Sequence, residues 1–312
     1  MVTHIDARQV AAGRQKGMTI PRRILPHTSW LITRRCSERR FFLLPSFEST
    51  QIFEYALARA ARITGVQLHA WMVMSNHYHL VVTDTESRLP EFVRLLNSFV
   101  ARALNFHYKR KEAFWKPGSY SAVQLCSKDT VLDKMAYTLM NPVVAGLVRL
   151  VSLWEGSSSY GMEFGQERVA RRPLCLTGFL KSVKGDETLR LTAPPNSLAA
   201  DMLAELQGEL KRRVKEVWTR FAAEGRRFLG MDAVSAQSWQ ESAKSEEPRG
   251  GIIPRFASKD PELLRQAIRE WRAWLTAYRL ALQAFSSGVR DAEFPAGTYM
   301  MKQRFDVVVA RH

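Results

Sequence analysis

Two histidines separated by one residue, His77 and His79, are the first side chains whose types and spacing suggest chemistry. They follow an apolar stretch and the turn-forming pair Ser75-Asn76, which places them at the start of an expected β-strand. Because alternate residues of a strand point to the same face, both imidazoles project together while Tyr78 points away. Two imidazoles so placed can share one metal ion, although histidine pairs at this spacing also occur as surface or packing residues.

A second pair of polar residues, Tyr137 and Asn141, lies four residues apart on a predicted helix, so the phenol and the amide share one helix face. If Asn141 adds an oxygen ligand to the two histidines, the mixed site suits Mg²⁺ or Mn²⁺. The metal would polarise a phosphate for in-line attack by Tyr137, whose phenol needs help to lose its proton because its ordinary pKa is about 10. Such an attack would store the phosphodiester energy in a phosphotyrosine bond and free a 3′ hydroxyl, which allows later strand joining without ATP.

The elements that must position these side chains follow from the spacing of apolar residues and from turn and capping signals. The pattern predicts a strand at 29–33, a charged turn at 34–40, a helix at 49–63 that Gly65 ends, and a hairpin of strands 68–74 and 79–83. It continues with a helix at 90–108, a strand at 121–125, and a helix that Ser127 caps and that ends at Asn141-Pro142. This order predicts an α+β layer in which one sheet face is covered and the other is free to hold a site.

The remaining sequence divides the chain into three parts. Residues 1–24 form a basic arm, residues 25–155 a catalytic domain, and residues 156–312 a mainly helical extension to which we assign no activity. Within the extension, the stretch after residue 156 is expected to be a linker or elaborated loop, helices are predicted at 197–228 and 260–285, and residues 232–256 are predicted to be a loop.

The charge of the chain points to a polyanionic partner. Its 312 residues carry 46 Lys and Arg against 30 Asp and Glu, a formal charge of +16, and basic proteins gain affinity for nucleic acids by releasing counterions from phosphates. A merely basic protein without such a partner is the alternative. Three cysteines without CxxC spacing, no signal peptide and no apolar run long enough for a bilayer favour a soluble, cytoplasmic protein.

The segments around both polar pairs resemble a known family. Trp71-Met72-Val73-Met74-Ser75-Asn76 leads into His77-Tyr78-His79 as the corresponding strand leads into the His-hydrophobic-His motif of the single-tyrosine HUH transposases. The run from Tyr137 to Val148 is similar to the tyrosine helix of the transposases associated with repetitive extragenic palindromes (REP). Both blocks occur in the expected order, and the resemblance covers roughly residues 24–160.

This resemblance implies a ferredoxin-like antiparallel sheet with helices on one face, a metal ion held by His77, His79 and Asn141, and nucleophilic attack by Tyr137. It also implies that the partner is single-stranded DNA with hairpins such as REP-like palindromes, bound by a monomer or a homodimer. Two departures stand out. The first strand often carries a histidine where this chain has Trp30-Leu31-Ile32, and many members end soon after the catalytic helix, whereas this chain continues to residue 312.

DNA binding would also need basic and aromatic side chains. The candidates for phosphate contacts are Arg34, Arg35, Arg39, Arg40, Arg102, Lys109, Arg110 and Lys111, with a solvated charged face as the alternative. Trp115 and Tyr120 are candidates for base stacking or for the core, and His69 and His107 are expected to be ordinary side chains.

Three other functions compete with a transposase. A domesticated DNA-binding protein with a vestigial site would bind hairpins without nicking them. A relaxase or replication initiator commonly shows a third histidine or a pair of tyrosines, and neither is evident around Tyr137. A simple hydrolase would use water and accumulate no covalent intermediate.

Overall fold

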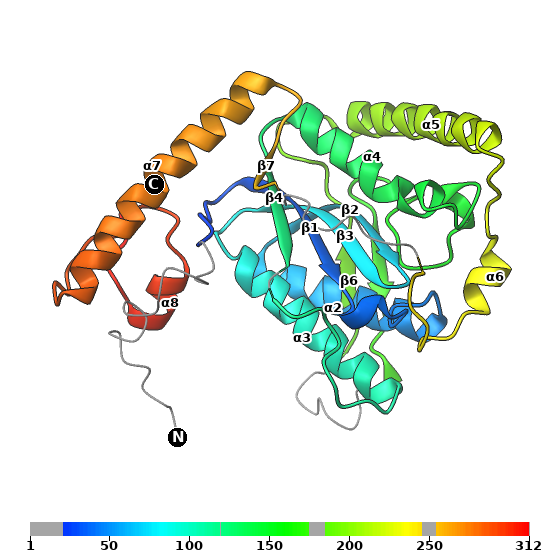
Figure 1. The fold of residues 1–312 in the computed structure, drawn as a ribbon, viewed down its shortest axis with the longest axis horizontal. Helices are drawn as coiled ribbons and strands as arrows, with labels where there is room; N and C mark the ends of the chain where they lie inside the picture. Colours follow the sequence, from blue (N-terminus) through cyan, green and yellow to red (C-terminus); the bar gives the residue numbers. More distant parts are fainter. Residues whose placement is uncertain (1–20, 119, 175–184, 245–253, 312) are drawn as a thin grey trace.

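The structure, a computed structural model, describes residues 21–118, 120–174, 185–244 and 254–311. Its centre is a βαββαβ unit followed by a long helix (Figure 1). The elements are β1 (Thr28–Arg35), α2 (Phe47–Thr64), β2 (Gln67–Met74), β3 (His77–Asp84), α3 (Leu89–His107), β4 (Ser121–Leu125) and α4 (Lys128–Val144). All of them occur in the predicted order. The charged turn begins later than predicted, because β1 runs to Arg35 before a short 3-10 helix, η1 (Ser37–Arg39).

The central sheet has the strand order β2-β3-β1-β4-β7. β1 pairs antiparallel with both β3 and β4, and β2 pairs antiparallel with β3, which is the ferredoxin-like arrangement. The predicted α+β class is therefore confirmed. The sheet is mixed rather than wholly antiparallel, because β7 (Phe256–Ala257) from the C-terminal part joins β4 in parallel. A strand of two residues is too short to show an alternating pattern in the sequence.

Different helices cover the two faces of this sheet. α2 and α3 lie on the face that carries Trp30, Ile32 and Tyr78, and all of these side chains belong to one buried core. α4 packs on the opposite face, over Leu31 and Val81, and α5 (Ala199–Ala223) packs against α4 (Figure 1). The prediction of helices on one face holds for the βαββαβ unit but is incomplete for the whole sheet. The face expected to be free is the one that α4 covers.

Capping residues explain where the two helices of the first layer begin and end. Ser46 and Ser49 form a reciprocal capping box at the start of α2, and Gly65 ends that helix with a φ of 71°. The fully buried Asp84 accepts hydrogen bonds from the backbone N–H groups of Arg88 and Leu89, at 2.9 and 2.7 Å. These bonds tie the end of β3 to the first turn of α3.

The helix that carries Tyr137 and Asn141 begins as predicted but ends later. The Ser127 hydroxyl accepts the N–H of Thr130 and caps α4. The predicted end at Asn141-Pro142 is wrong, because α4 continues through Pro142 to Val144 and Gly146 follows in the left-handed region. A proline favours but does not force a helix end, and here burial of Pro142 and Val143 in the core over the sheet outweighs that preference.

The C-terminal part is more structured than predicted. The segment expected to be a linker contains a 3-10 helix, η2 (Val151–Leu153), and an antiparallel pair, β5 (Glu167–Ala170) and β6 (Glu187–Arg190), which packs on α2. The predicted helices are confirmed as α5 and α7 (Pro261–Ser286). The expected loop at 232–256 holds part of α6 (Met231–Ser235) and the start of β7, and a last helix, α8 (Met300–Phe305), packs near the end of α7 (Figure 1).

Two predictions concern the ends of the chain and membranes. Most of the basic arm at 1–24 lies outside the described residues, which begin at residue 21. None of the helices in the ranges that the structure covers is both long and apolar enough to cross a bilayer.

Candidate active site

The two histidines lie where the hairpin pattern predicts them, at the start of β3. His79 lies opposite Met72 of β2 and Thr33 of β1, so its ring projects from the face that α4 covers. His77 projects from the same face, and the centroids of the two rings are 4.8 Å apart. Tyr78 points to the opposite face, where its hydroxyl donates to Asn97 Oδ1 at 2.8 Å. The predicted alternation along β3 is therefore confirmed.

α4 brings the second pair of side chains to the same place. The ring centroid of Tyr137 lies 5.4 Å from that of His79, and the two rings meet edge to face. The amide of Asn141, one helical turn further on, lies beside both His77 and His79, where it would accept a hydrogen bond from either ring in its protonated form. Four side chains from two elements that are distant in the sequence thus converge within a single chain.

The helix backbone holds the amide of Asn141 in this orientation. Its Nδ2 donates to the carbonyl of Tyr137 at 2.9 Å and to that of Thr138 at 3.4 Å. Pro142 has no N–H to donate to the Thr138 carbonyl, four residues earlier, so the Asn141 amide contributes a bond that the helix lacks. With its N–H groups used inside the helix, Asn141 presents its oxygen to the histidines.

Each imidazole uses one ring nitrogen for a neighbour on the sheet. His77 Nδ1 donates to Asn76 Oδ1 at 2.7 Å, and His79 Nδ1 lies 2.8 Å from the hydroxyl of Thr33. The second nitrogen of each ring remains for the side where Asn141 lies. A neutral His77 therefore presents a lone pair next to the oxygen of Asn141, an arrangement of acceptors that a cation satisfies.

This donor set fits a divalent metal ion. Two imidazole nitrogens and one amide oxygen suit ions such as Mg²⁺ or Mn²⁺, and the contact of each Nδ1 fixes the ring orientation. Within the described ranges, no three His, Cys, Asp or Glu side chains come together as a metal site. A metal bound to the histidines would therefore need a ligand of another type, and Asn141 is in place to supply it.

Burial keeps the two imidazoles neutral. Burial, followed by the charges of Arg35 and Arg39, lowers the pKa of His77 to about 4. Burial, followed by the neighbouring His77 and by Arg35, lowers the pKa of His79 well below its ordinary value. The hydrogen bond to Asn141 opposes both shifts. Near neutral pH both rings are therefore in the form that binds metals.

Several cations surround the phenol and the imidazoles. Arg35 is exposed at the end of β1 opposite His77, and its charge interacts with Tyr137 as well as with both histidines. Lys134 Nζ lies 5.6 Å from the centroid of the Tyr137 ring. Arg35 was predicted from the sequence as a DNA contact, whereas Lys134 was missed, although its three-residue spacing from Tyr137 puts Lys134 and Tyr137 at neighbouring positions of one helix face. These charges favour a phosphate beside the phenol.

The other basic residues predicted to contact DNA differ in their contacts and in their exposure. Three have contacts within the protein: Arg34 donates to the carbonyl of Gly118, Arg40 pairs with Glu38, and the guanidinium of Arg110 stacks on Phe42 at 3.7 Å. The exposed members are Arg102, Lys109 and Lys111, near the end of α3, and Arg39 is half-buried near His77. Arg35 and Arg39 are therefore the members of the predicted set that act on the charge of the candidate site.

The aromatic residues and the other histidines have structural positions. Trp115 is buried and donates to the carbonyl of Asn97, and Tyr120 is half-buried beneath Arg22. His69 is buried between the Thr192 carbonyl and the Thr83 hydroxyl, at 2.8 and 2.7 Å. His107 is exposed at the end of α3. The expectation that these histidines are ordinary side chains agrees with this geometry.

The sequence of this chain is similar to that of a known protein family. Residues 32–133 match the family described as "Transposase IS200 like". The matched segment contains β3 with His77 and His79 and ends within α4, just before Tyr137. No curated protein sequence matches this chain.

Two solved structures are similar to parts of this chain. One is a REP-associated tyrosine transposase bound to a REP hairpin, with 19% identity, a TM-score of 0.40, and coverage of 46% of this chain and 83% of the other. The second is a Deinococcus radiodurans R1 protein provisionally identified as a transposase, with 22% identity, a TM-score of 0.29, and coverage of 38% and 95%.

Proposed function

We propose that this chain is an IS200-like transposase that cuts and rejoins single-stranded DNA through a 5′-phosphotyrosine on Tyr137, and the family match over residues 32–133 supports the first part of this proposal. The observation that carries this proposal is the meeting of β3 and α4. The ring of Tyr137 lies 5.4 Å from that of His79, and the amide of Asn141 lies beside both histidines. The proposed nucleophile and the proposed metal ligands are thus adjacent.

The proposed reaction is a phosphoryl transfer in two balanced steps. The phenol oxygen of Tyr137 loses its proton to solvent and attacks the scissile phosphorus, the bond from phosphorus to the 3′ oxygen breaks, and the 3′ oxygen takes up a proton from solvent as it leaves. The downstream strand is then joined to Tyr137 through its 5′ phosphate. Attack by a 3′ hydroxyl on this phosphotyrosine reverses the exchange and rejoins DNA. No ATP is needed, because each step exchanges one phosphodiester for another.

The side chains around Tyr137 have separate tasks in these steps. Arg35 and Lys134 attract the phosphate and stabilise negative charge on the phenol oxygen. His77, His79 and Asn141 would hold Mg²⁺ or Mn²⁺, which when bound would polarise the scissile phosphate. A DNA strand can reach Tyr137, because this residue is 44% exposed to solvent.

We propose DNA with hairpins, including REP-like palindromes, as the substrate class. The formal charge of +16 favours binding to a polyanion, and the exposed Arg102, Lys109 and Lys111 lie near the end of α3. Because His79 and Tyr137 meet within one chain, we further propose that a single chain supplies both the metal ligands and the nucleophile. Either a monomer or a dimer is compatible with this arrangement.

The test uses single-stranded hairpin oligonucleotides labelled at one end or the other. With Mg²⁺ or Mn²⁺, we expect a denaturing gel to show protein attached to the 3′-labelled fragment and a free 3′ end on the 5′-labelled fragment. Tyr137→Phe should abolish the adduct. Tyr160→Phe is the matched control, because Tyr160 is similarly exposed, at 43%, and lies outside the site.

Each alternative function predicts a different gel. A vestigial DNA-binding protein would bind the hairpin and leave it intact with every metal tested. A hydrolase would cut the hairpin without retaining protein on either fragment. A covalent adduct that persists in Tyr137→Phe would contradict the assignment of the nucleophile.

A further inference from the structure

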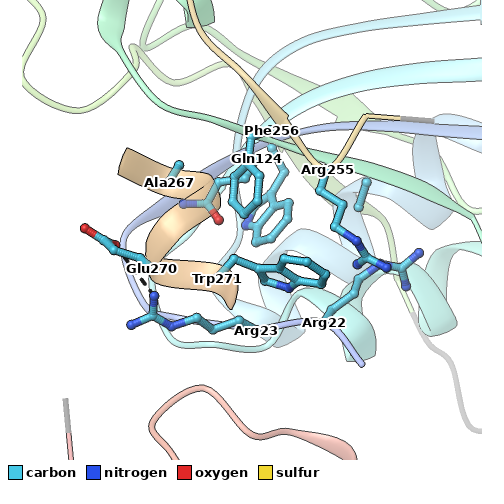
Figure 2. A pocket seen from close by; sticks show the side chains of 10 residues that line it. Arg22, Arg23, Gln124, Arg255, Phe256, Ala267, Glu270 and Trp271 are labelled. Atoms are coloured by element: carbon cyan, nitrogen blue, oxygen red, sulfur yellow. Dashed lines mark ion pairs between the residues drawn. The ribbon is translucent and has the colours of Figure 1, made fainter. Parts of the chain in front are cut away.

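A small cavity lies away from the candidate active site, between the sheet edge and α7. Its volume is about 40 Å³, and it is lined by β1, β4, β7, α7 and the segment before β1 (Figure 2). Trp30 and Gln124 line it from paired positions on β1 and β4, on the face opposite to the histidines. The volume exceeds the roughly 10–15 Å³ that one water molecule needs, so the cavity can hold a small polar group.

The charge around this cavity is strongly positive. Arg22, Arg23 and Arg255 line it, and among the described residues of the lining Glu270 is the one acid. Glu270 pairs with Arg23 at 3.7 Å. Figure 2 shows the guanidinium groups of Arg22 and Arg255 close together beside the ring of Trp271, and the Arg255 guanidinium lies 4.6 Å from the centroid of that ring.

The positive charges of the neighbouring Arg22 and Arg255 guanidinium groups make their proximity unfavourable unless an anion lies between them. Burial, followed by the charge of Arg22, lowers the pKa of Arg255. Two guanidinium groups in a partly buried place repel each other, and an anion between them would turn this repulsion into attraction.

In the same lining, two buried N–H groups also lack a hydrogen-bond acceptor among the described residues. Trp30 is only 4% exposed, and within the part of the chain that the structure describes its Nε1–H has no hydrogen-bond acceptor. The same holds for the Nε–H of Arg23. A buried donor without an acceptor is energetically unfavourable. The cavity thus gathers donors and positive charge, which is the complement of an oxyanion.

We propose that this cavity binds a phosphate group of a single-stranded DNA segment that flanks the DNA in the active site. Guanidinium groups and an indole N–H match the oxygens of a phosphate, and the half-buried Trp271 offers a ring to the adjoining nucleotide. The cavity is large enough for a phosphoryl group and too small for a whole nucleotide. This inference rests on the proposed function only in taking DNA as the partner.

The position of the cavity sets the length of DNA that reaches it. Trp30 is five residues from Arg35 along β1, or about 17 Å, and its side chain lies on the other face of the sheet. A strand must therefore run along the sheet and around its edge. Successive phosphates of a strand are about 3.4 Å or more apart, so a flank of at most about ten nucleotides is long enough to cover this path.

The experiment measures binding in the full chain carrying Tyr137→Phe, so that cleavage does not interfere. Fluorescence anisotropy would be recorded over a range of salt concentrations with a bare hairpin and with the same hairpin carrying flanks of increasing length. With long flanks, Arg255→Gln should weaken binding about tenfold and reduce the slope of log K against log salt by about 1. With the bare hairpin, Arg255→Gln should have no effect.

Two control variants separate the cavity from the general positive field. Arg255→Lys keeps the charge and should retain the slope. Arg272→Gln removes an exposed charge one residue from Trp271, outside the cavity, and should change binding less than twofold. An unchanged salt slope in Arg255→Gln at every flank length would overturn the proposal, whether or not the chain cleaves DNA.

A second measurement does not depend on how the Arg255 variants fold. In ¹⁵N spectra of the Tyr137→Phe chain, the indole N–H of Trp30, assigned with Trp30→Phe, should shift when the long-flank DNA binds and stay in place with the bare hairpin. If 10 mM inorganic phosphate shifts this signal and the long-flank DNA does not, the cavity binds free phosphate and the DNA assignment is wrong. No shift with either probe would also overturn it.

Discussion

The two halves of the candidate active site differ in how firmly the protein holds them. The strand half, His77 and His79, lies in the middle of a hydrogen-bonded sheet, and His79 is only 5% exposed. The helix half presents Tyr137 with 44% of its side chain open to solvent. The difference indicates that the proposed metal ligands are fixed in advance, whereas the proposed nucleophile stays accessible to a DNA strand.

The sharpest way to separate the halves is to remove one side chain from each. His79→Ala should lower both Mn²⁺ affinity and cleavage by more than about 100-fold, because loss of a ligand should exceed the 10- to 100-fold effect of losing a supporting contact. Tyr137→Phe should abolish cleavage and leave Mn²⁺ affinity within about twofold, since its ring contacts His79 without the hydroxyl being a ligand. Calorimetric titration with Mn²⁺ and single-turnover cleavage measure the two effects.

Two results would contradict this difference between the strand half and the helix half. If His79→Ala retained wild-type Mn²⁺ affinity, the metal would bind elsewhere. If Tyr137→Phe lost metal affinity as strongly as His79→Ala, the phenol would belong to the metal site, and the division into two halves would be wrong.

The strand half could be predicted from the sequence because its geometry is local. Alternation along β3 puts His77 and His79 on one face with no information about other elements, and the hairpin at Ser75-Asn76 shows where the strand begins. The contacts that orient the rings could be predicted only in part. Asn76 is the neighbour of His77 in sequence, whereas Thr33 meets His79 through pairing between β1 and β3.

The helix half was predicted as a pair but not in its detail. Four-residue spacing places Tyr137 and Asn141 on one face, yet the helix continues beyond Pro142. Burial of that end against the sheet and α5 decides the boundary, and such tertiary packing leaves no periodic signal. The cavity between β7 and α7 was missed for the same reason, because Arg22, Trp30 and Arg255 are far apart in the chain.

Buried imidazoles should make the sheet sensitive to acid. Burial lowers the pKa of His69 to about 4, below the ordinary value of about 6.5, so the unfolded chain binds more protons between these values. Stability from His69 is therefore complete above about pH 6.5 and is lost as pH falls through about 4, by an amount on the order of 3 kcal/mol. Denaturant titrations at pH 7 and pH 4 measure it.

His69→Gln isolates this contribution. Glutamine can replace hydrogen bonds of the ring without taking up a proton, so the variant should lose less stability between pH 7 and pH 4 than the wild type. His107→Gln, which changes an exposed histidine, should keep the wild-type dependence. An equal loss in all three proteins would show that His69 does not contribute to acid sensitivity.

A smaller effect should come from the residue that orients His79. Thr33→Val removes the hydroxyl 2.8 Å from Nδ1 and keeps the shape of the side chain, so Mn²⁺ affinity should fall about 10- to 100-fold. Ser29→Ala, on the same strand as Thr33, removes a hydroxyl contact of 2.8 Å to Thr83 of β3, away from His77 and His79, and should leave Mn²⁺ affinity unchanged. Equal Mn²⁺ affinities in the two variants would mean that the His79 ring does not need its hydrogen bond to Thr33 of β1.

The smallest expected effect on cleavage comes from a change in the helix half, which should raise the stability of the protein and lower its cleavage rate. Pro142→Ala restores an N–H that can reach the Thr138 carbonyl, so the helix should gain about 1 kcal/mol from the added hydrogen bond, and the Asn141 amide loses one of its two acceptors. We expect a higher unfolding midpoint together with a cleavage rate reduced a few-fold, because Asn141 is then less firmly oriented toward His77 and His79. Pro45→Ala, in the loop before α2 and far from the site in sequence, is the control and should leave the cleavage rate unchanged. If Pro142→Ala cleaved as fast as the wild type, the two acceptors would not be needed to hold Asn141, and the helix half would be as rigid as the strand half.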